Sequence, residues 1–142
     1  IDEIRGAIRD FPKSNALLGG YEFSNSEIAE AVVRTVNRFN AAPPNLGVVG
    51  TSNWPFTYTM PLIDGILAEL FDIASSYFRR GHLPYSAGNL SVDDMAKEKD
   101  YVNAAATYRQ RYDDWVRITR QRLNMEMAFG SIGSIYSAGG YW

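Results

Sequence analysis

The segment from Ser91 to about Met127 most constrains the fold, because its pattern predicts one helix of some 35 residues. Ser91 and Asp94 have the spacing of a capping box, and Leu90 with Met95 has the spacing of a hydrophobic staple. Such a helix is about 50 Å long, more than a compact domain of this size needs. We therefore expect it to project from the core or to bend.

The charges and the apolar positions of this segment fit the same prediction. Acidic residues lead it, and arginines close it, which suits the helix dipole. The apolar positions at helical spacing that we expect to form its buried stripe are Tyr101, Ala105, Tyr108, Tyr112, Trp115 and Ile118.

Three further helices are predicted. The first covers about residues 2–10 and is ended by Pro12. The second begins at Ser24, where Glu27 completes a capping box and Phe23 and Ile28 a staple. Its apolar face is expected to be Ile28, Ala29, Val32, Val36 and Phe39, and Pro43-Pro44 stops it.

The third of these helices runs from about Pro61 to Arg80 and has a wide apolar face, which predicts the central core helix. Gly81 suits its C-terminal cap. Its apolar stretch at 62–78 contains Asp64, Glu69 and Asp72, too many charges for a membrane span. The predicted fold is all-α: a small bundle of about four helices at 1–128, with an extended C-terminal arm at 129–142.

A long loop at about 41–60, "AAPPNLGVVGTSNWPFTYTM", lacks helical periodicity. "FTYTM" alternates and could pair with "LGVV" as a short β-hairpin. Its aromatic residues Trp54, Phe56 and Tyr58 are candidate partner-binding residues, because aromatics are enriched at interface centres. The alternative, that the loop folds back on its own core, stays open.

The stretch "AFGSIGSIYSAGGYW" at 128–142 has no charged side chain and is rich in glycine. Its glycines make folding back on the core costly in entropy unless a large surface receives it. We therefore expect it to bind a partner, through Phe129, Ile132, Ile135, Tyr136, Tyr141 and Trp142.

Composition and motifs argue against catalysis. The 142 residues include one histidine, His82, and no cysteine, which leaves little for a zinc site. The net charge of −2 provides no basic field for nucleic acid. The sequence has no P-loop or GxGxxG, and His82 is best explained as part of a helix cap. We expect no enzyme activity, metal or cofactor, and a chain outside the membrane.

Arginines concentrate near the end of the long helix, beside two aspartates. The set expected to pair with acidic surfaces, within the chain or between subunits, is Arg109, Arg111, Asp113, Asp114, Arg117 and Arg120. The alternative function is a helical DNA-associated protein that uses these arginines together with Arg122. The overall acidity favours charge pairing.

Two stretches, "YEFSNSEIAEAVVRTVNRFNAAPPN" and "LPYSAGNLSVDDMAKEKDYVNAAATYRQRYDDWVRITRQRLNMEMAFGSIGSIYS", resemble head–tail adaptor proteins of tailed bacteriophages, also called neck, connector or head-completion proteins. The likeness covers roughly residues 17–137 and contains no catalytic signature. It implies a mostly helical virion protein of the neck, between capsid and tail. Commonly twelve copies form a ring beneath the portal.

In such a ring, DNA passes through the channel without being read. The resemblance implies contacts with the portal protein, with the next neck or tail protein and with further copies of the chain. A C-terminal arm commonly reaches the portal, which makes the segment from Phe129 to Trp142 the candidate arm. The loop from Pro43 to Met60 is then a candidate contact with a neighbour.

Overall fold

The computed structural model describes residues 1–15, 20–80, 86–87, 90–91 and 94–129. Their fold is all-α, as predicted. The helices are α1 (Asp2–Ile8), α2 (Asn25–Ala41), α3 (Thr59–Arg80) and α4 (Asp94–Phe129). Between them lie two 3-10 turns, η1 (Thr51–Asn53) and η2 (Phe56–Tyr58), and an antiparallel pair of two-residue strands, β1 (Ser86–Ala87) and β2 (Leu90–Ser91).

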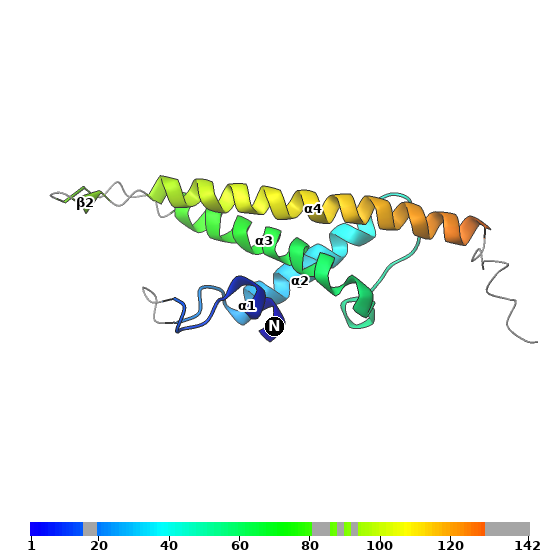
Figure 1. Ribbon diagram of the computed structural model, residues 1–142, viewed down its shortest axis with the longest axis horizontal. Helices are drawn as coiled ribbons and strands as arrows, with labels where there is room; N and C mark the ends of the chain where they lie inside the picture. The colour runs from blue at the N-terminus through cyan, green and yellow to red at the C-terminus, as the bar shows by residue number, and fades with distance from the viewer. Residues whose placement is uncertain (16–19, 81–85, 88–89, 92–93, 130–142) are drawn as a thin grey trace, which may run out of the picture.

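Helix α3 is the centre of the molecule, because α1, α2 and α4 all contact it. Helices α3 and α4 run side by side along the long axis, and α1 and α2 lie together beside α3 (Figure 1). None of the described helices is long and apolar enough to span a membrane. The prediction that the third helix forms the core is confirmed, since its Ile66 and Leu70 are almost fully buried.

Helix α1 ends earlier than predicted, at Ile8 rather than near Asp10. Arg9 adopts the left-handed conformation with φ 55°, so the chain leaves the helix three residues before Pro12. The turn brings Asp10 to Arg5, where the buried carboxylate and guanidinium lie 2.6 Å apart. Asp10 also accepts hydrogen bonds from the backbone N–H groups of Glu22 and Phe23. The hydrogen bonds of Arg5 and Asp10 to residues 22–25 fasten α1 to the beginning of α2.

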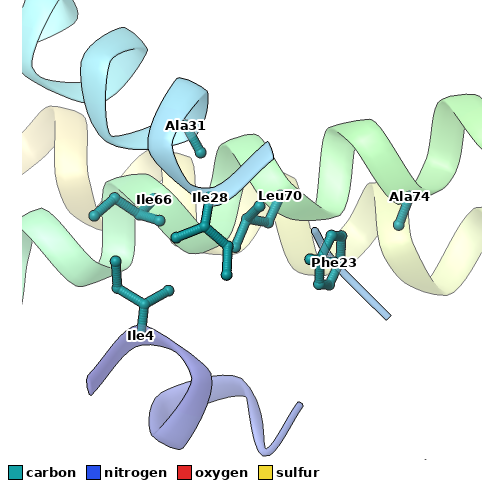
Figure 2. Packing of buried hydrophobic residues seen from close by; sticks show 7 residues of the cluster. All are labelled: Ile4, Phe23, Ile28, Ala31, Ile66, Leu70 and Ala74. Atoms are coloured by element: carbon teal, nitrogen blue, oxygen red, sulfur yellow. The ribbon is translucent and has the colours of Figure 1, made fainter. Parts of the chain in front are cut away.

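The capping box of α2 is confirmed. Ser24 accepts from the N–H of Glu27, and the Glu27 carboxylate accepts from the N–H of Ser24 at 2.7 Å. The staple residues Phe23 and Ile28 are buried in one cluster with Ile66 and Leu70 of α3 (Figure 2). These contacts hold the first turn of α2 on the central helix.

One position of the predicted α2 face is wrong, because Ala29 is exposed whereas Ala31 and Thr35 are buried. Thr35 satisfies its hydroxyl by donating to the carbonyl of Ala31, so a polar side chain is accommodated in the core. Beside it lies Gly65 of α3, where an added Cβ would collide with Thr35 and meet the ring of Tyr112 at 3.0 Å. Three helices therefore approach closely at a glycine.

Helix α4 has 36 residues and begins at Asp94, three residues after the predicted start. The side chains of Ser91 and Met95, and with them the predicted cap and staple, lie outside the described residues, as do Gly81 and His82. The last turns of α4 extend past α3 (Figure 1), so the expected projection from the core is confirmed.

Of the stripe predicted for α4, Ala105 and Tyr112 are buried, and Tyr101, Tyr108 and Trp115 are half-buried. Ile118 is the position that is wrong, because it is 59% exposed. Each step of three residues, from Tyr112 to Trp115 and from Trp115 to Ile118, rotates the position about 60° away from the contact line. The buried positions that continue the line are Val116, Thr119 and Arg120.

Candidate interaction surfaces

The loop between α2 and α3 has a defined backbone, with no strand where the sequence left a short hairpin possible. Phe56–Tyr58 form η2, and Thr59 and Met60 already belong to α3. Asn40 of α2 holds the preceding part of the loop, because its side-chain amide both donates to the carbonyl of Val49 and accepts from its N–H, each at 2.9 Å. This pairing satisfies the backbone groups of Val49 without a second strand.

Two of the three loop aromatics pack against their own chain. Trp54 lies edge-on to Phe39 of α2, with ring centroids 5.2 Å apart. Tyr58 lies edge-on to Trp115 of α4 at 5.1 Å, and Trp115 stacks on Phe39. Phe56 is different, because 89% of it is exposed. Of the three residues predicted to bind a partner, Phe56 is therefore the accessible one.

Arg120 is the charged residue whose environment differs most from expectation. Arg120 is only 1% exposed, so it does not fit the predicted pairing with another subunit. The guanidinium donates to the carbonyls of Asn40 and Ala42 at 3.0–3.1 Å and lies over the ring of Phe39. It thereby caps the C-terminal end of α2, where backbone carbonyls lack partners within the helix.

Other members of the predicted charge set also find partners within the chain. Arg109 reaches Glu69 and Asp72 of α3. Asp113 accepts two hydrogen bonds from Arg38 of α2, at 2.7 and 2.8 Å. These pairs join α4 to both neighbouring helices.

The remaining three are on the exposed side of α4. Arg117 pairs with Asp114 one turn away at 3.2 Å, and Arg111 lies over the ring of Tyr108. Both arginines and Asp114 are exposed, so they stay available for contacts between subunits.

The shifted pKa values around these residues follow from the same contacts. The hydrogen bond from Arg38 to Asp113 raises the pKa of the Arg38 guanidinium. Burial raises the pKa of Tyr112, whose hydroxyl donates to the carbonyl of Thr35, and the charge of Asp113 raises it further. Burial also raises the pKa of Asp64, although Arg111 opposes the change. These three shifts accompany the packing of the helices.

A groove between α2 and α3 has a volume of about 410 Å³. Its carboxylates already have partners: Glu27 accepts from Tyr77, Glu30 pairs with Arg34, and Glu69 and Asp72 share Arg109. Among the described residues no group of three or more histidines or carboxylates is placed to hold a metal ion. The groove therefore resembles a solvated salt-bridge surface more than a binding site for a small molecule.

The last turns of α4 carry the most concentrated exposed apolar side chains. Met125 is 57%, Met127 69% and Phe129 77% exposed. Ile118 precedes Met125 by seven residues and Phe129 by eleven, which places the three on one side of the helix. We call Ile118, Met125 and Phe129 the α4 edge. The seven-residue spacing is visible in the sequence, but the helical pattern predicts Ile118 in the core and does not point to Met125.

The predicted arm is described only at its first residue. Phe129 is the last residue of α4, so it belongs to the helix and not to an extended segment. The other predicted arm residues, Ile132, Ile135, Tyr136, Tyr141 and Trp142, lie outside the described part of the chain.

Comparison of the chain with protein-family models, with curated proteins and with solved structures finds no match.

Proposed function

We propose that this protein is a structural subunit of the neck of a tailed bacteriophage. In this role it forms a ring, commonly of twelve copies, that joins the portal to the tail and continues the DNA channel. The proposal starts from the sequence resemblance. The observation that carries it furthest is the end of α4, which extends past the bundle with Met125, Met127 and Phe129 exposed and leads into an uncharged segment.

Burying those side chains would be favourable, because each large apolar side chain contributes about 1.5–3 kcal/mol when fully covered. A subunit of an assembly can carry such residues, since a neighbour covers them. Under this proposal, residues 129–142 contact the portal, and Phe56 contacts the next subunit or ring component.

The charged residues support a packing role more than a DNA-binding role. Arg120 is buried against carbonyls, and Arg109 is shared between two carboxylates of α3. The alternative of a DNA-associated protein then rests chiefly on Arg111, Arg117 and Arg122. That alternative requires binding of duplex DNA that weakens steeply with salt, and absence of binding at low salt would rule it out.

The proposal is tested by sedimentation of the protein with assembled portal protein from the same genome. The full chain should co-sediment, whereas a chain cut after Met127 should keep its helical circular dichroism and bind at least tenfold more weakly. Val33→Ser is the matched control, because Val33 is an exposed apolar residue of α2 far in sequence from the arm. Equal binding by the truncated and full chains would contradict the role of the arm.

A further inference from the structure

The loop before α3 presents an apolar surface whose backbone is held in place. Phe56 and Met60 are 89% and 73% exposed, and their spacing of four residues, where η2 continues into α3, places them on one side. Trp54 and Tyr58 pack against the bundle on either side of Phe56, and Thr59 donates to the carbonyl of Phe56 at 2.7 Å. We call Phe56 and Met60 the apolar knob. Because its backbone is already ordered, the knob loses little conformational entropy on binding.

A hollow of about 390 Å³ lies at the other end of α3, where the beginning of α2 meets that helix. It is lined by Tyr21 and Tyr77, which are 55% and 62% exposed, and by the buried ring of Phe23. We call Tyr21, Phe23 and Tyr77 the aromatic socket. A cavity of about 150 Å³ holds a benzene ring, so the hollow has room for a phenylalanine side chain. Edge-on and offset contacts between aromatic rings are favourable, and the tyrosines of the socket offer them.

The main polar groups that line the socket already have partners within the chain. Arg5 donates to the carboxylate of Asp10 and to the carbonyl of Phe23. The hydroxyl of Tyr77 donates to Glu27 at 2.8 Å. An occupant of the socket therefore does not have to supply hydrogen bonds, and it gains most from apolar and aromatic contacts. The apolar knob has this chemistry.

The charges beside the two surfaces are opposite in sign. Glu22 and Glu27 line the socket. Residues 41–63, which contain the knob, have no charged side chain, and Arg122 of α4 lies beside them, because it donates to a hydroxyl of η2 at 2.9 Å. Arg122 also pairs with Glu126 at 3.5 Å, yet its side chain is 55% exposed. A cation beside the knob and carboxylates beside the socket favour contact between unlike surfaces over contact between like ones.

The knob and the socket are too far apart to meet within one chain. The knob lies at the beginning of α3, and Tyr77 is in its last turn (Figure 1). The helix from Thr59 to Tyr77 is about 27 Å long at 1.5 Å per residue. The socket that receives the knob therefore belongs to a second copy. Since the two surfaces are different, each pair of copies keeps one knob and one socket unoccupied, and the contact can repeat from copy to copy.

We propose that copies of this chain associate head to tail, with Phe56 of one copy inserted into the aromatic socket of the next. The inference rests on the proposed function, in which a ring requires contact between neighbouring copies, and it names the two surfaces that meet. The knob presents on the order of 300 Å² of apolar surface, less than the about 800 Å² on each partner of a standard interface. A single contact is therefore weak, and ring closure or a template adds to it.

Disulfide trapping tests the contact, because the chain has no cysteine of its own. Thr57→Cys places a thiol beside the knob, and Ser26→Cys places one beside the socket; both positions are exposed. Protein at about 1 mM populates even a contact with a Kd of that order. When the two variants are mixed and oxidised, they should give at least tenfold more cross-linked dimer than either variant alone. A chain that carries both cysteines should give a ladder of larger products.

Two serine substitutions in the Thr57→Cys chain locate the contact. Phe56→Ser should reduce the mixed dimer at least tenfold. Phe129→Ser is the matched control and should leave the yield unchanged, since Phe129 is also a highly exposed phenylalanine but lies at the end of α4. Circular dichroism should show the same helix content for both, because neither side chain is in the core.

Equal trapping with Phe56→Ser would overturn the proposal, as would the absence of any cross-linked product. A Thr57→Cys chain that cross-links to itself as well as to the Ser26→Cys chain would also overturn it, because the knobs would then meet each other. So would products of the chain with both cysteines that stop at dimers. None of these readouts involves the portal. A negative result here, with co-sedimentation on the portal intact, rejects the knob and socket and leaves the proposed function standing.

Discussion

The loop at 46–58 and the last turns of α4 both carry large apolar residues outside the predicted buried faces of the helices, yet these residues have opposite environments. Trp54 and Tyr58 of the loop lie in an aromatic cluster with Phe39 and Trp115. At the end of α4, Met125 and Phe129 are more than half exposed. The loop is therefore part of the bundle, whereas the end of α4 packs against no other helix among the described residues.

The two segments differ in burial because the backbone of the loop is held against α2, whereas the end of α4 is not held against another helix. The loop returns to α2 because Asn40 pairs with Val49 and because Arg120 caps the carbonyls at the end of α2. The last turns of α4 extend beyond α3, so no helix faces them among the described residues (Figure 1). Aromatic residues outside a helical pattern thus indicate an interface only where the backbone does not place them against the core of their own chain.

The largest expected effect comes from breaking the anchor of the loop. Arg120→Ala removes the donor for the carbonyls of Asn40 and Ala42 and opens a cavity beside Phe39. We expect the free energy of unfolding to fall by about 3 kcal/mol or more, because buried acceptors are left unpaired. Urea denaturation measures this change. A loss below about 1 kcal/mol would show that Arg120 does not hold the loop.

The next effect separates two residues of one loop. Trp54→Ala should cost about 2–3 kcal/mol, somewhat less than a fully buried tryptophan, because Trp54 is half-buried. Phe56→Ala should change stability by less than about 0.5 kcal/mol, since that residue is exposed. Trp54→Phe is the matched control and should cost less than the alanine change. Similar losses for the alanine variants at 54 and 56 would contradict the packing described for the loop.

A smaller effect belongs to the other end of α2, away from the loop. Ser24→Ala removes the cap and should cost about 1 kcal/mol. The hydrogen bonds from Ser24 lower the pKa of Glu27 in the folded protein. The stability from this ionised carboxylate is therefore present above about pH 4 and lost as the pH falls through the lowered pKa.

Urea denaturation of the wild type and of Ser24→Ala between pH 3 and 6 measures this contribution. The difference in unfolding free energy between the two proteins should shrink toward the acid end. A difference that grows as the pH falls would contradict the role of the ionised Glu27.

The smallest effect on stability is expected at the α4 edge. Ile118→Ser and Met125→Ser should each alter the unfolding free energy of the truncated chain by less than about 0.5 kcal/mol, because neither side chain is in the core. Thermal unfolding followed by circular dichroism suffices. A loss near 2 kcal/mol for either variant would mean that the substituted side chain packs against the helical bundle.

Local signals predicted much of the fold. The S-x-x-E pattern at Ser24 located the start of α2, and the apolar spacing identified α3 as the central helix. These succeed because capping and periodicity depend on neighbours in the chain. The backbone of the loop and the burial of Arg120 were not predictable in the same way.

The role of Arg120 shows why. Its acceptors lie 78–80 residues away in sequence, and a charged residue in a helix is normally expected at the surface. Ile118 shows the converse error, because an isoleucine near the helical period was assigned to the core. A count of 3.6 residues per turn from Tyr112 favours Val116 and Thr119 and would have placed Ile118 outside.

The most direct measurement of the central claim is electron microscopy of the full chain mixed with assembled portal protein from the same genome. The account predicts a ring of this protein on the tail-facing side of the portal, with the projecting end of α4 and residues 129–142 directed toward the portal. Portal particles without added density, under conditions where the protein remains folded, would contradict it.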